Sequence, residues 1–381
     1  MILTFVSLVS FVLNSTRDTK ICFRIRFGGR MSLLKIGGVL LVAGMAVSGA
    51  TLAQRAAPAG PPAARAVDAA RAFLATVDDR QRAKVTLSLN ADTRKVWSNL
   101  PTGIAMQVGA TERNGLKFGD LTPAQQNAAL ALVGAVLSRA GYEKVMNIVN
   151  ADQTLEVSSA PSRAAGSKIK FGRAEFYMAI LGTPSTTGRW MMQFGGHHLA
   201  INVTVSGQDS ALTPTHTGAQ PAAYTLNGET IRPLGRENDK AFALMTALDA
   251  AQRKAALLGY QVRNLVLGPG EDGKVIQPEG VRGSTLTAAH REMLLDLVGE
   301  WVNILNDEAA AAKMADVRRN LGDTYFAWAG STTNGEAAYF RVQGPTLLIE
   351  YAPQGANNST DHIHTIYRDP TNDYGAKLVG R

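Results

Sequence analysis

Two short segments of this sequence contain four of its six histidines. The segment "DHIHTIYRDP" places His362 and His364 one residue apart, and "GGHHLAINV" places His197 and His198 directly after two glycines. Alternate side chains of a β-strand point to the same face, about 7 Å apart, so His362 and His364 can both reach one metal ion. A third nitrogen, from His197 or His198, would complete a site with a position open to water or substrate. The ligand type predicts a divalent transition metal, zinc or copper.

Two carboxylates near these histidines are candidates for a further role. Adjacent residues of a strand face opposite sides, so we expect only one of His197 and His198 to join the site. Glu350, in the apolar strand "TLLIEYAPQ", and Asp361 are candidates for a fourth ligand, for orienting a ligand, or for general-base catalysis. With a metal-bound water, such a base would serve metal-assisted hydrolysis.

The same residues admit two other interpretations, so whether the protein is an enzyme stays open. One is a metal-free binding module, with a groove lined by the histidines, Arg341 and Arg368 that recognises an anionic small molecule or a glycan. The other is a set of structural histidines whose nitrogens are satisfied by backbone or carboxylate groups. His216 and His290 are expected to stand apart from the cluster, His290 on a helix.

Composition removes several classes of function. The only cysteine is Cys22, so thiolate metal sites and cysteine nucleophiles are excluded from the rest of the chain. The sequence has no G-x-S-x-G, H-E-x-x-H or phosphate-binding loop motif. The formal charge is +8, but much of the excess lies before residue 70, and no dense basic stripe with interleaved aromatics remains. We therefore expect no nucleic-acid partner, and the identity of any small-molecule ligand or substrate stays unknown.

The N-terminal residues resemble an export signal preceded by an extension. Residues 31–53, "MSLLKIGGVLLVAGMAVSGATLA", have a short cationic start, an apolar run and a small-residue end, which is typical of a cleaved signal peptide. The apolar run is too short to favour a permanent membrane span. Residues 1–30 are best interpreted as an extension from a misplaced start codon, and residues 54–64 as a flexible linker. We expect a periplasmic or secreted protein.

The remaining chain, residues 65–381, contains an internal repeat. "FLATVDDRQRAK" matches "LMTALDAAQRKA", "NGLKFGDLTPAQQ" matches "EGVRGSTLTAAHR", and "FYMAILGTPSTTGRW" matches "YFAWAGSTTNGEAAY". The three pairs begin at Phe73 and Leu244, at Asn114 and Glu279, and at Phe176 and Tyr325. Three matches in the same order predict a duplicated unit, with copy one at about 65–235 and copy two at about 236–381.

The repeat also predicts the fold class. In the first two blocks the apolar periodicity indicates amphipathic helices, with Thr122 and Thr287 as N-caps. In the third block, short polar turns between aromatic and β-branched runs, one of them Asn334-Gly335, indicate β-hairpins. We expect an α+β domain in which helices pack on one side of an antiparallel sheet built from two β-meanders about a pseudo-twofold axis.

Several of these motifs together resemble the domain-of-unknown-function 3500 family. They are "RWMMQFGGHHLAINVTV", "ALTPTHTGAQPA", "YFRVQGPTLLIEYAPQ" and "DHIHTIYRDPTNDYG", in this order, and the resemblance extends from about residue 65 to the end. It implies an exported protein of mostly bacterial type. It brings no established activity, substrate or catalytic residue, so the prediction of function rests on the residues themselves.

Overall fold

The computed structural model describes residues 60–104, 113–354 and 359–378. All of these lie within one compact unit, residues 57–381. The expected signal peptide, the upstream extension and most of the expected linker lie outside the described residues. Within the described part of the chain, no helix is long and apolar enough to cross a membrane.

The described residues contain nine α-helices. These are α1 (Pro62–Thr76), α2 (Asp79–Val85), α4 (Pro123–Val136), α5 (Arg139–Ser158), α6 (Ala160–Ala164), α7 (Gly235–Ala247), α8 (Ala250–Ala256), α9 (Ala288–Val302) and α10 (Asp307–Arg319). Thr122 and Thr287 accept the backbone N–H groups of the third helical residues of α4 and α9, so both predicted N-caps are confirmed.

Each of the matched segments beginning at Phe73 and Leu244 contains a break between two helices. Asp78 and Asp249 interrupt the apolar periodicity, because each forms a capping box with the glutamine three residues on and starts a new helix, α2 or α8. The sequence predicted a single helix in each segment, and the acidic cap is the reason for the difference.

The strands form one large sheet and one separate hairpin. They are β1 (Thr86–Leu87), β2 (Leu116–Lys117), β3 (Tyr177–Leu181), β4 (Arg189–Gly196), β5 (Leu199–Ser206), β6 (Asp209–Ala211), β7 (Thr215–Ala219), β8 (Tyr224–Leu226), β9 (Glu229–Ile231), β10 (Val281–Arg282), β11 (Tyr325–Gly330), β12 (Ala338–Gly344), β13 (Leu347–Pro353) and β14 (Ile363–Arg368). Twelve of them form the large sheet, in the order β1-β3-β4-β5-β7-β14-β13-β12-β11-β10, with β2 and β6 beside β3 and β5. Only β1 and β3 pair in parallel among the described strands.

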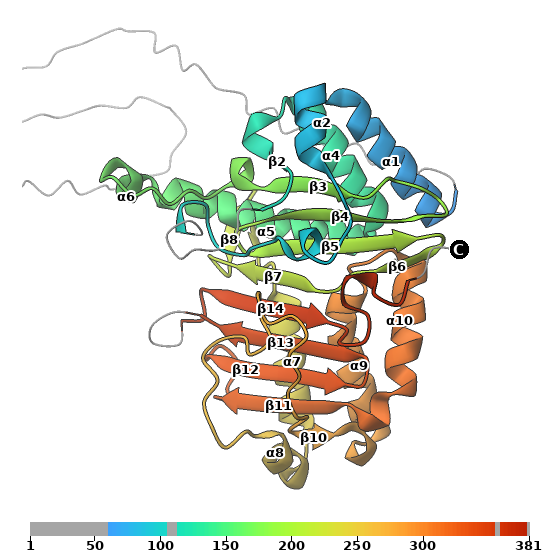
Figure 1. Ribbon diagram of the computed structural model, residues 1–381. Coiled ribbons are helices and arrows are strands. Elements are labelled where there is room, and N and C mark those ends of the chain that lie inside the picture. Colours follow the sequence, from blue (N-terminus) through green and yellow to red (C-terminus); the bar gives the residue numbers. More distant parts are fainter. Residues whose placement is uncertain (1–59, 105–112, 355–358, 379–381) are drawn as a thin grey trace, which may run out of the picture. The chain divides into compact units, whose positions relative to one another are not determined.

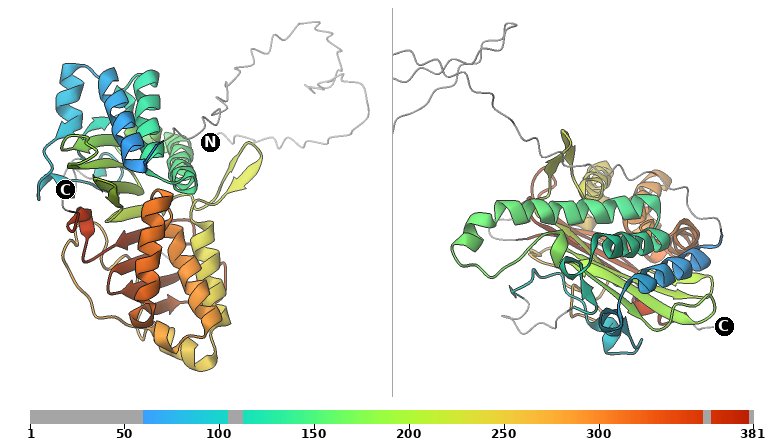
Figure 2. Two further views of the ribbon diagram at one scale, coloured as in Figure 1. Left: turned by 90° about the vertical axis from the view of Figure 1, so that its right-hand side faces the viewer. Right: turned by 90° about the horizontal axis from the view of Figure 1, so that it is seen from above.

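The sheet is covered differently on its two faces (Figures 1 and 2). Helices lie on one face, where Phe242 of α7 packs edge-on against Trp328 and Trp301 of α9 donates to Oγ1 of Thr365 at 2.9 Å. On the other face, residues 86–100 and 257–281, which have little regular secondary structure, cover small hydrophobic clusters of the sheet. The predicted α+β class with a mostly antiparallel sheet is therefore confirmed, whereas the duplication and its pseudo-twofold axis stay predictions.

The centre of the sheet joins strands that are far apart in the sequence. β7 lies antiparallel to β14, with Thr217 opposite Thr365 and Gly218 opposite His364 (Figure 1). β5 lies on the other side of β7, with Leu199 opposite Thr217. This arrangement brings the start of β14 close to the start of β5, and both segments contain histidines.

Candidate metal centre

A tight hairpin positions the first pair of histidines. β4 and β5 are paired as far as Gly196 and Leu199, so His197 and His198 form the two-residue connection between them. Of these two residues only His198 has a positive φ, 64°, a conformation found at the second central residue of type II turns. A Cβ at Gly196 would lie 2.8 Å from the ring of Phe176, which explains the glycine before the hairpin. Both residues of the turn are buried, with 6% of the surface of His197 and 1% of that of His198 exposed.

The second pair comes from the start of β14, and a glycine makes room for it. Gly218 of β7 lies opposite His364. A Cβ at Gly218 would be 3.1 Å from Cδ2 of His198, 3.2 Å from Cδ2 of His364 and 2.8 Å from the carbonyl oxygen of Ile363. The missing side chain therefore leaves the space in which an imidazole of the β4–β5 turn meets one of β14.

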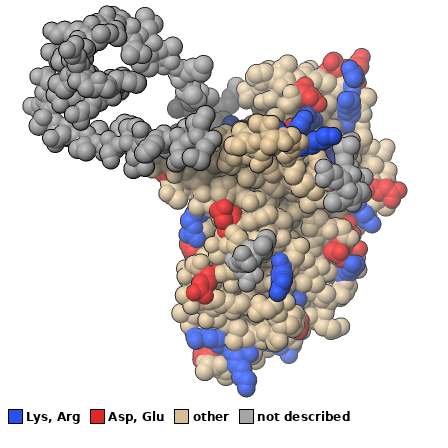
Figure 3. Space-filling model, turned by 90° about the vertical axis from the view of Figure 1, so that its left-hand side faces the viewer, with Lys and Arg blue, Asp and Glu red and all other residues tan. Residues whose placement is uncertain are grey.

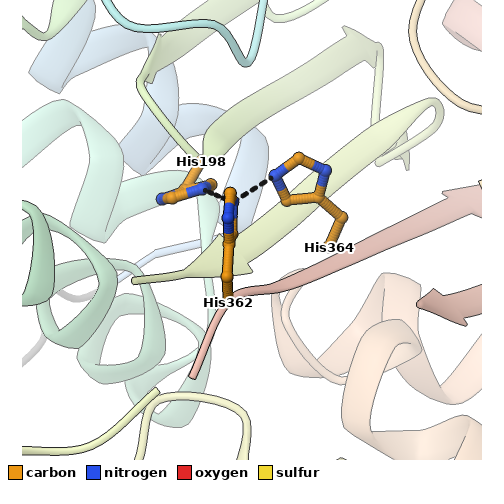
Figure 4. A group of neighbouring side chains, drawn as sticks. All are labelled: His198, His362 and His364. Atoms are coloured by element: carbon orange, nitrogen blue, oxygen red, sulfur yellow. Dashed lines mark hydrogen bonds between the residues drawn. The ribbon is translucent and has the colours of Figure 1, made fainter. Parts of the chain in front are cut away.

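Three Nε2 atoms converge at this place (Figure 4). Nε2 of His198 lies 2.7 Å from Nε2 of His362, and Nε2 of His362 lies 3.1 Å from Nε2 of His364. One nitrogen of each of the three residues lies within 4.8 Å of the others. Zinc–nitrogen bonds of 2.0–2.1 Å in a tetrahedron place nitrogens about 3.3–3.4 Å apart, so small movements would bring the three rings to ligand geometry.

Three neutral imidazoles in this arrangement cannot satisfy the hydrogen-bonding needs of all three Nε2 atoms. A neutral ring nitrogen has either one hydrogen or one lone pair, so it makes one strong in-plane hydrogen bond. Nε2 of His362 lies beside two other Nε2 atoms but can form a strong hydrogen bond with only one of them. At least one of these two contacts is therefore left without a proper hydrogen bond. A metal ion accepts all three lone pairs at once, and the donor set therefore suits a cation.

The protonation state of the three histidines also favours metal binding. Burial is the main cause that lowers the pKa of His198 and of His364 well below the usual value, and neighbouring histidines add to the effect. Burial also lowers the pKa of His362 to about 4. The rings are therefore neutral near pH 7, which is the form that binds metals.

His216 belongs to the same cluster, although the sequence placed it apart. Its ring lies edge-on to that of His364, with 5.0 Å between the centroids. Its Nδ1 is 3.3 Å from the carbonyl oxygen of His198, and its Nε2 is 3.3 Å from Nδ2 of Asn99. One neutral tautomer satisfies both contacts, and burial lowers the pKa of His216 to about 3. His216 therefore packs against His364 and contacts the backbone of His198, and both of its ring nitrogens already have partners.

His197 forms a pair with a buried carboxylate that the sequence analysis did not identify. Its Nδ1 lies 2.6 Å from Oδ1 of Asp152 on α5, and Oδ2 of Asp152 accepts the N–H of Gly172 at 2.7 Å. The rings of His197 and His198 lie 3.6 Å apart between centroids. Donor atoms of Asp152, His197 and His198 lie within 4.8 Å of one another, so a second group of potential ligands adjoins the first through His198.

The two candidate carboxylates from the sequence make other contacts. Glu350 is fully buried on β13, and it accepts the N–H groups of Val266 and Leu267 at 3.0 and 2.7 Å and the hydroxyl of Tyr339 at 2.5 Å. Asp361 is exposed beside His362 and accepts the N–H of Ala222 at 3.1 Å. Glu350 thus fixes the segment that covers the sheet, while Asp361 is adjacent to the histidine group.

The two candidate arginines form ion pairs with carboxylates of the protein. Arg341 pairs with Glu279 at 2.9 Å. Arg368 pairs with Asp272 and Asp373, each at 2.9 Å, and donates to the carbonyl oxygens of residues 267 and 268. Both guanidinium charges are balanced within the protein. The structure therefore brings the histidines together and leaves both arginines outside the group.

Comparison with known proteins gives one match. A family model described as "Protein of unknown function (DUF3500)" matches residues 59–376, which include every residue of the histidine cluster. No curated protein and no solved structure shows significant similarity to the chain.

Proposed function

The chain belongs to the DUF3500 family, whose description assigns no activity, and we propose from the histidine cluster that it is a metal-binding protein. Nε2 atoms of His198, His362 and His364 bind one divalent transition metal, zinc or copper. The observation that carries the proposal is the convergence of three Nε2 atoms, one from a buried and two from half-buried histidines, that cannot satisfy one another.

The number of protein ligands and the nearby carboxylates bear on the reaction that the proposed metal centre supports. Three protein ligands leave a position for water or substrate, which suits metal-assisted hydrolysis. Of the two carboxylates proposed for proton transfer, Asp361 lies beside His362, whereas Glu350 already accepts three hydrogen bonds. Asp361 is therefore the better candidate for the general base. We place the protein in the periplasm or outside the cell, on the signal-like residues 31–53.

The alternative of a metal-free binding module, with a groove lined by the histidines and two arginines, receives less support. It required Arg341 and Arg368 to line a groove for an anion, and both side chains pair with carboxylates of the protein. A glycan-binding role has no specific contact in its favour among the described residues.

The proposal is tested by metal content. The chain from Arg55 is produced without a histidine tag and exported to the periplasm, and its metals are quantified by plasma mass spectrometry. The wild type is compared with the His362→Ala/His364→Ala double variant and with His290→Ala, which removes a histidine of α9 far from the cluster in the sequence. About one equivalent of one metal in the wild type and His290→Ala, lost in a folded double variant, supports the proposal. Equal metal content in all three proteins, or none after reconstitution, refutes it.

A further inference from the structure

A second group of potential metal ligands, Asp152, His197 and His198, adjoins the three converging Nε2 atoms. One donor atom of each residue lies within 4.8 Å of those of the other two. All three residues are buried, whereas His362 and His364 of the first group are half-buried. The second group also contains a carboxylate, which the first group lacks. It therefore offers a cation a negative charge in a place largely shielded from water.

The local structure fixes the side chain of Asp152. Its Oδ2 accepts the N–H of Gly172 at 2.7 Å, so Oδ1 is the oxygen that faces Nδ1 of His197, at 2.6 Å. Gly172 has φ of 91°, a conformation that glycine adopts readily and other residues rarely. The ring of Phe171 packs against that of His197, with 5.0 Å between the centroids. Residues 171 and 172 thus hold the carboxylate and the imidazole in place.

The ligand types suit a divalent transition metal, since histidines combined with a carboxylate form known zinc and iron sites. Zinc bonds of about 2.0–2.2 Å in a tetrahedron place ligand atoms about 3.3–3.5 Å apart, so Nδ1 of His197 and Oδ1 of Asp152 would separate by about 0.7–0.9 Å. In the metal-free protein their hydrogen bond occupies this position. The ion would replace the shared proton, as is usual when a metal binds.

His198 belongs to both groups and would link them. Its Nε2 lies beside that of His362, which leaves Nδ1 for the second group. A ring that binds metals through both nitrogens has lost its N–H proton, so filling both groups releases a further proton to the solvent.

Other charges near Asp152 limit its attraction for a cation. Burial lowers the pKa of Arg113 to about 10, and the charge of Asp152 is one of the causes that oppose this fall. Asp152 thus already interacts with one cation, so we expect weaker binding than its charge alone would give. The face seen in Figure 3 shows acidic and basic residues scattered over a mostly uncharged surface. We therefore attribute the attraction of an ion to Asp152 and not to a patch on that face.

We propose that Asp152, His197 and His198 bind a divalent transition-metal ion of their own, so that the histidine cluster holds two ions when both groups are filled. This site goes beyond the proposed function, because it does not use His362 or His364. The competing explanation is that the hydrogen bond between Asp152 and His197 only fastens the hairpin to α5.

The test is the number of zinc ions bound by the chain from Arg55 as free zinc is raised. The wild type is compared with His362→Ala/His364→Ala, with Asp152→Asn, which keeps the shape of the side chain and removes its charge, and with Glu156→Gln. Glu156 is the matched control, since it lies on the same helix and accepts the N–H of Phe171 at 3.3 Å. We expect about two zinc ions in the wild type and in Glu156→Gln, and about one in each of the other two proteins.

The outcomes separate this inference from the proposed function. One zinc that is lost in His362→Ala/His364→Ala and retained in Asp152→Asn supports the proposed function and overturns the second site. One zinc with the opposite pattern supports the second site and refutes the proposed function. Equal zinc binding in the wild type and Asp152→Asn overturns the inference, whatever the number of ions.

A measurement on the wild type keeps the test valid even if Asp152→Asn fails to fold. The Nδ1–H proton of His197 is followed by nuclear magnetic resonance during the zinc titration. Zinc at the second site removes this proton, so its resonance should disappear. A resonance that persists at saturating zinc overturns the inference.

Discussion

Replacing Gly218 by alanine tests the geometry of the metal centre without removing any proposed ligand. The added Cβ would lie 3.1 Å from the ring of His198, 3.2 Å from that of His364 and 2.8 Å from the carbonyl oxygen of Ile363. These contacts are closer than ordinary carbon–carbon packing, so the two rings must move apart. We expect the metal-free variant to be less stable by about 1–3 kcal/mol, as is usual when a packed core receives an extra methyl group.

We also expect Gly218→Ala to weaken metal binding, because the added Cβ displaces the rings of His198 and His364. Substitutions of residues that orient metal ligands typically weaken metal affinity by about ten- to a hundredfold, or about 1.4–2.7 kcal/mol, and we expect a loss of this size in Gly218→Ala. The assay is competition for zinc between the protein and a chelator of known affinity, together with urea denaturation of the metal-free form.

The control is Gly259→Ala, which adds the same methyl group where nothing lies within 4 Å. Unchanged zinc affinity in Gly218→Ala, with Gly259→Ala also unchanged, would show that the rings do not need this space and would refute the reasoning. Equal losses in both variants would show that the effect comes from the backbone and not from the site.

Three further predictions concern stability and the role of single groups. The metal-free protein should lose stability as the pH falls below about 6.5, because the unfolded chain takes up protons there while folded His216 and His362, with pKa values of about 3 and about 4, stay neutral. Each of the two contributes up to about 1.4 kcal/mol per pH unit, and a flat profile in urea denaturation between pH 7 and 5 would contradict this. Trp301→Phe should cost about 1 kcal/mol in urea denaturation, because it removes the buried hydrogen bond to Thr365; no change would mean that this contact is not formed. Glu350→Gln should cost about 1.5–3 kcal/mol and leave zinc affinity unchanged, because the carboxylate accepts backbone N–H groups; a lost metal would instead assign Glu350 to the centre.

The local part of the site could be predicted from the sequence. The spacing of His362 and His364 follows from the two-residue period of a strand, which needs no knowledge of the rest of the fold. The sequence argument expected one residue of the pair His197 and His198 to join them, and in the structure it is Nε2 of His198 that lies beside Nε2 of His362. Both residues form a hairpin turn, and the conformation of His198 directs its ring to the group while His197 turns to Asp152.

The remaining members depend on contacts that no local pattern encodes. His216 enters the cluster because β7 lies beside β14, and Asp152 because α5 crosses the sheet near the hairpin.

The position of the three imidazoles also has a consequence for how the chain is held together. His198 and His362 are separated by 164 residues, and the sequence has a single cysteine, so it cannot form an intramolecular disulfide. An ion bound by both would act as a cross-link that closes a loop of this length. Because the three nitrogens come together only when β5, β7 and β14 have assembled, the ion would bind the folded chain and not the unfolded one. The strength of that cross-link would rise with the concentration of free metal, whereas a disulfide bond has a fixed strength.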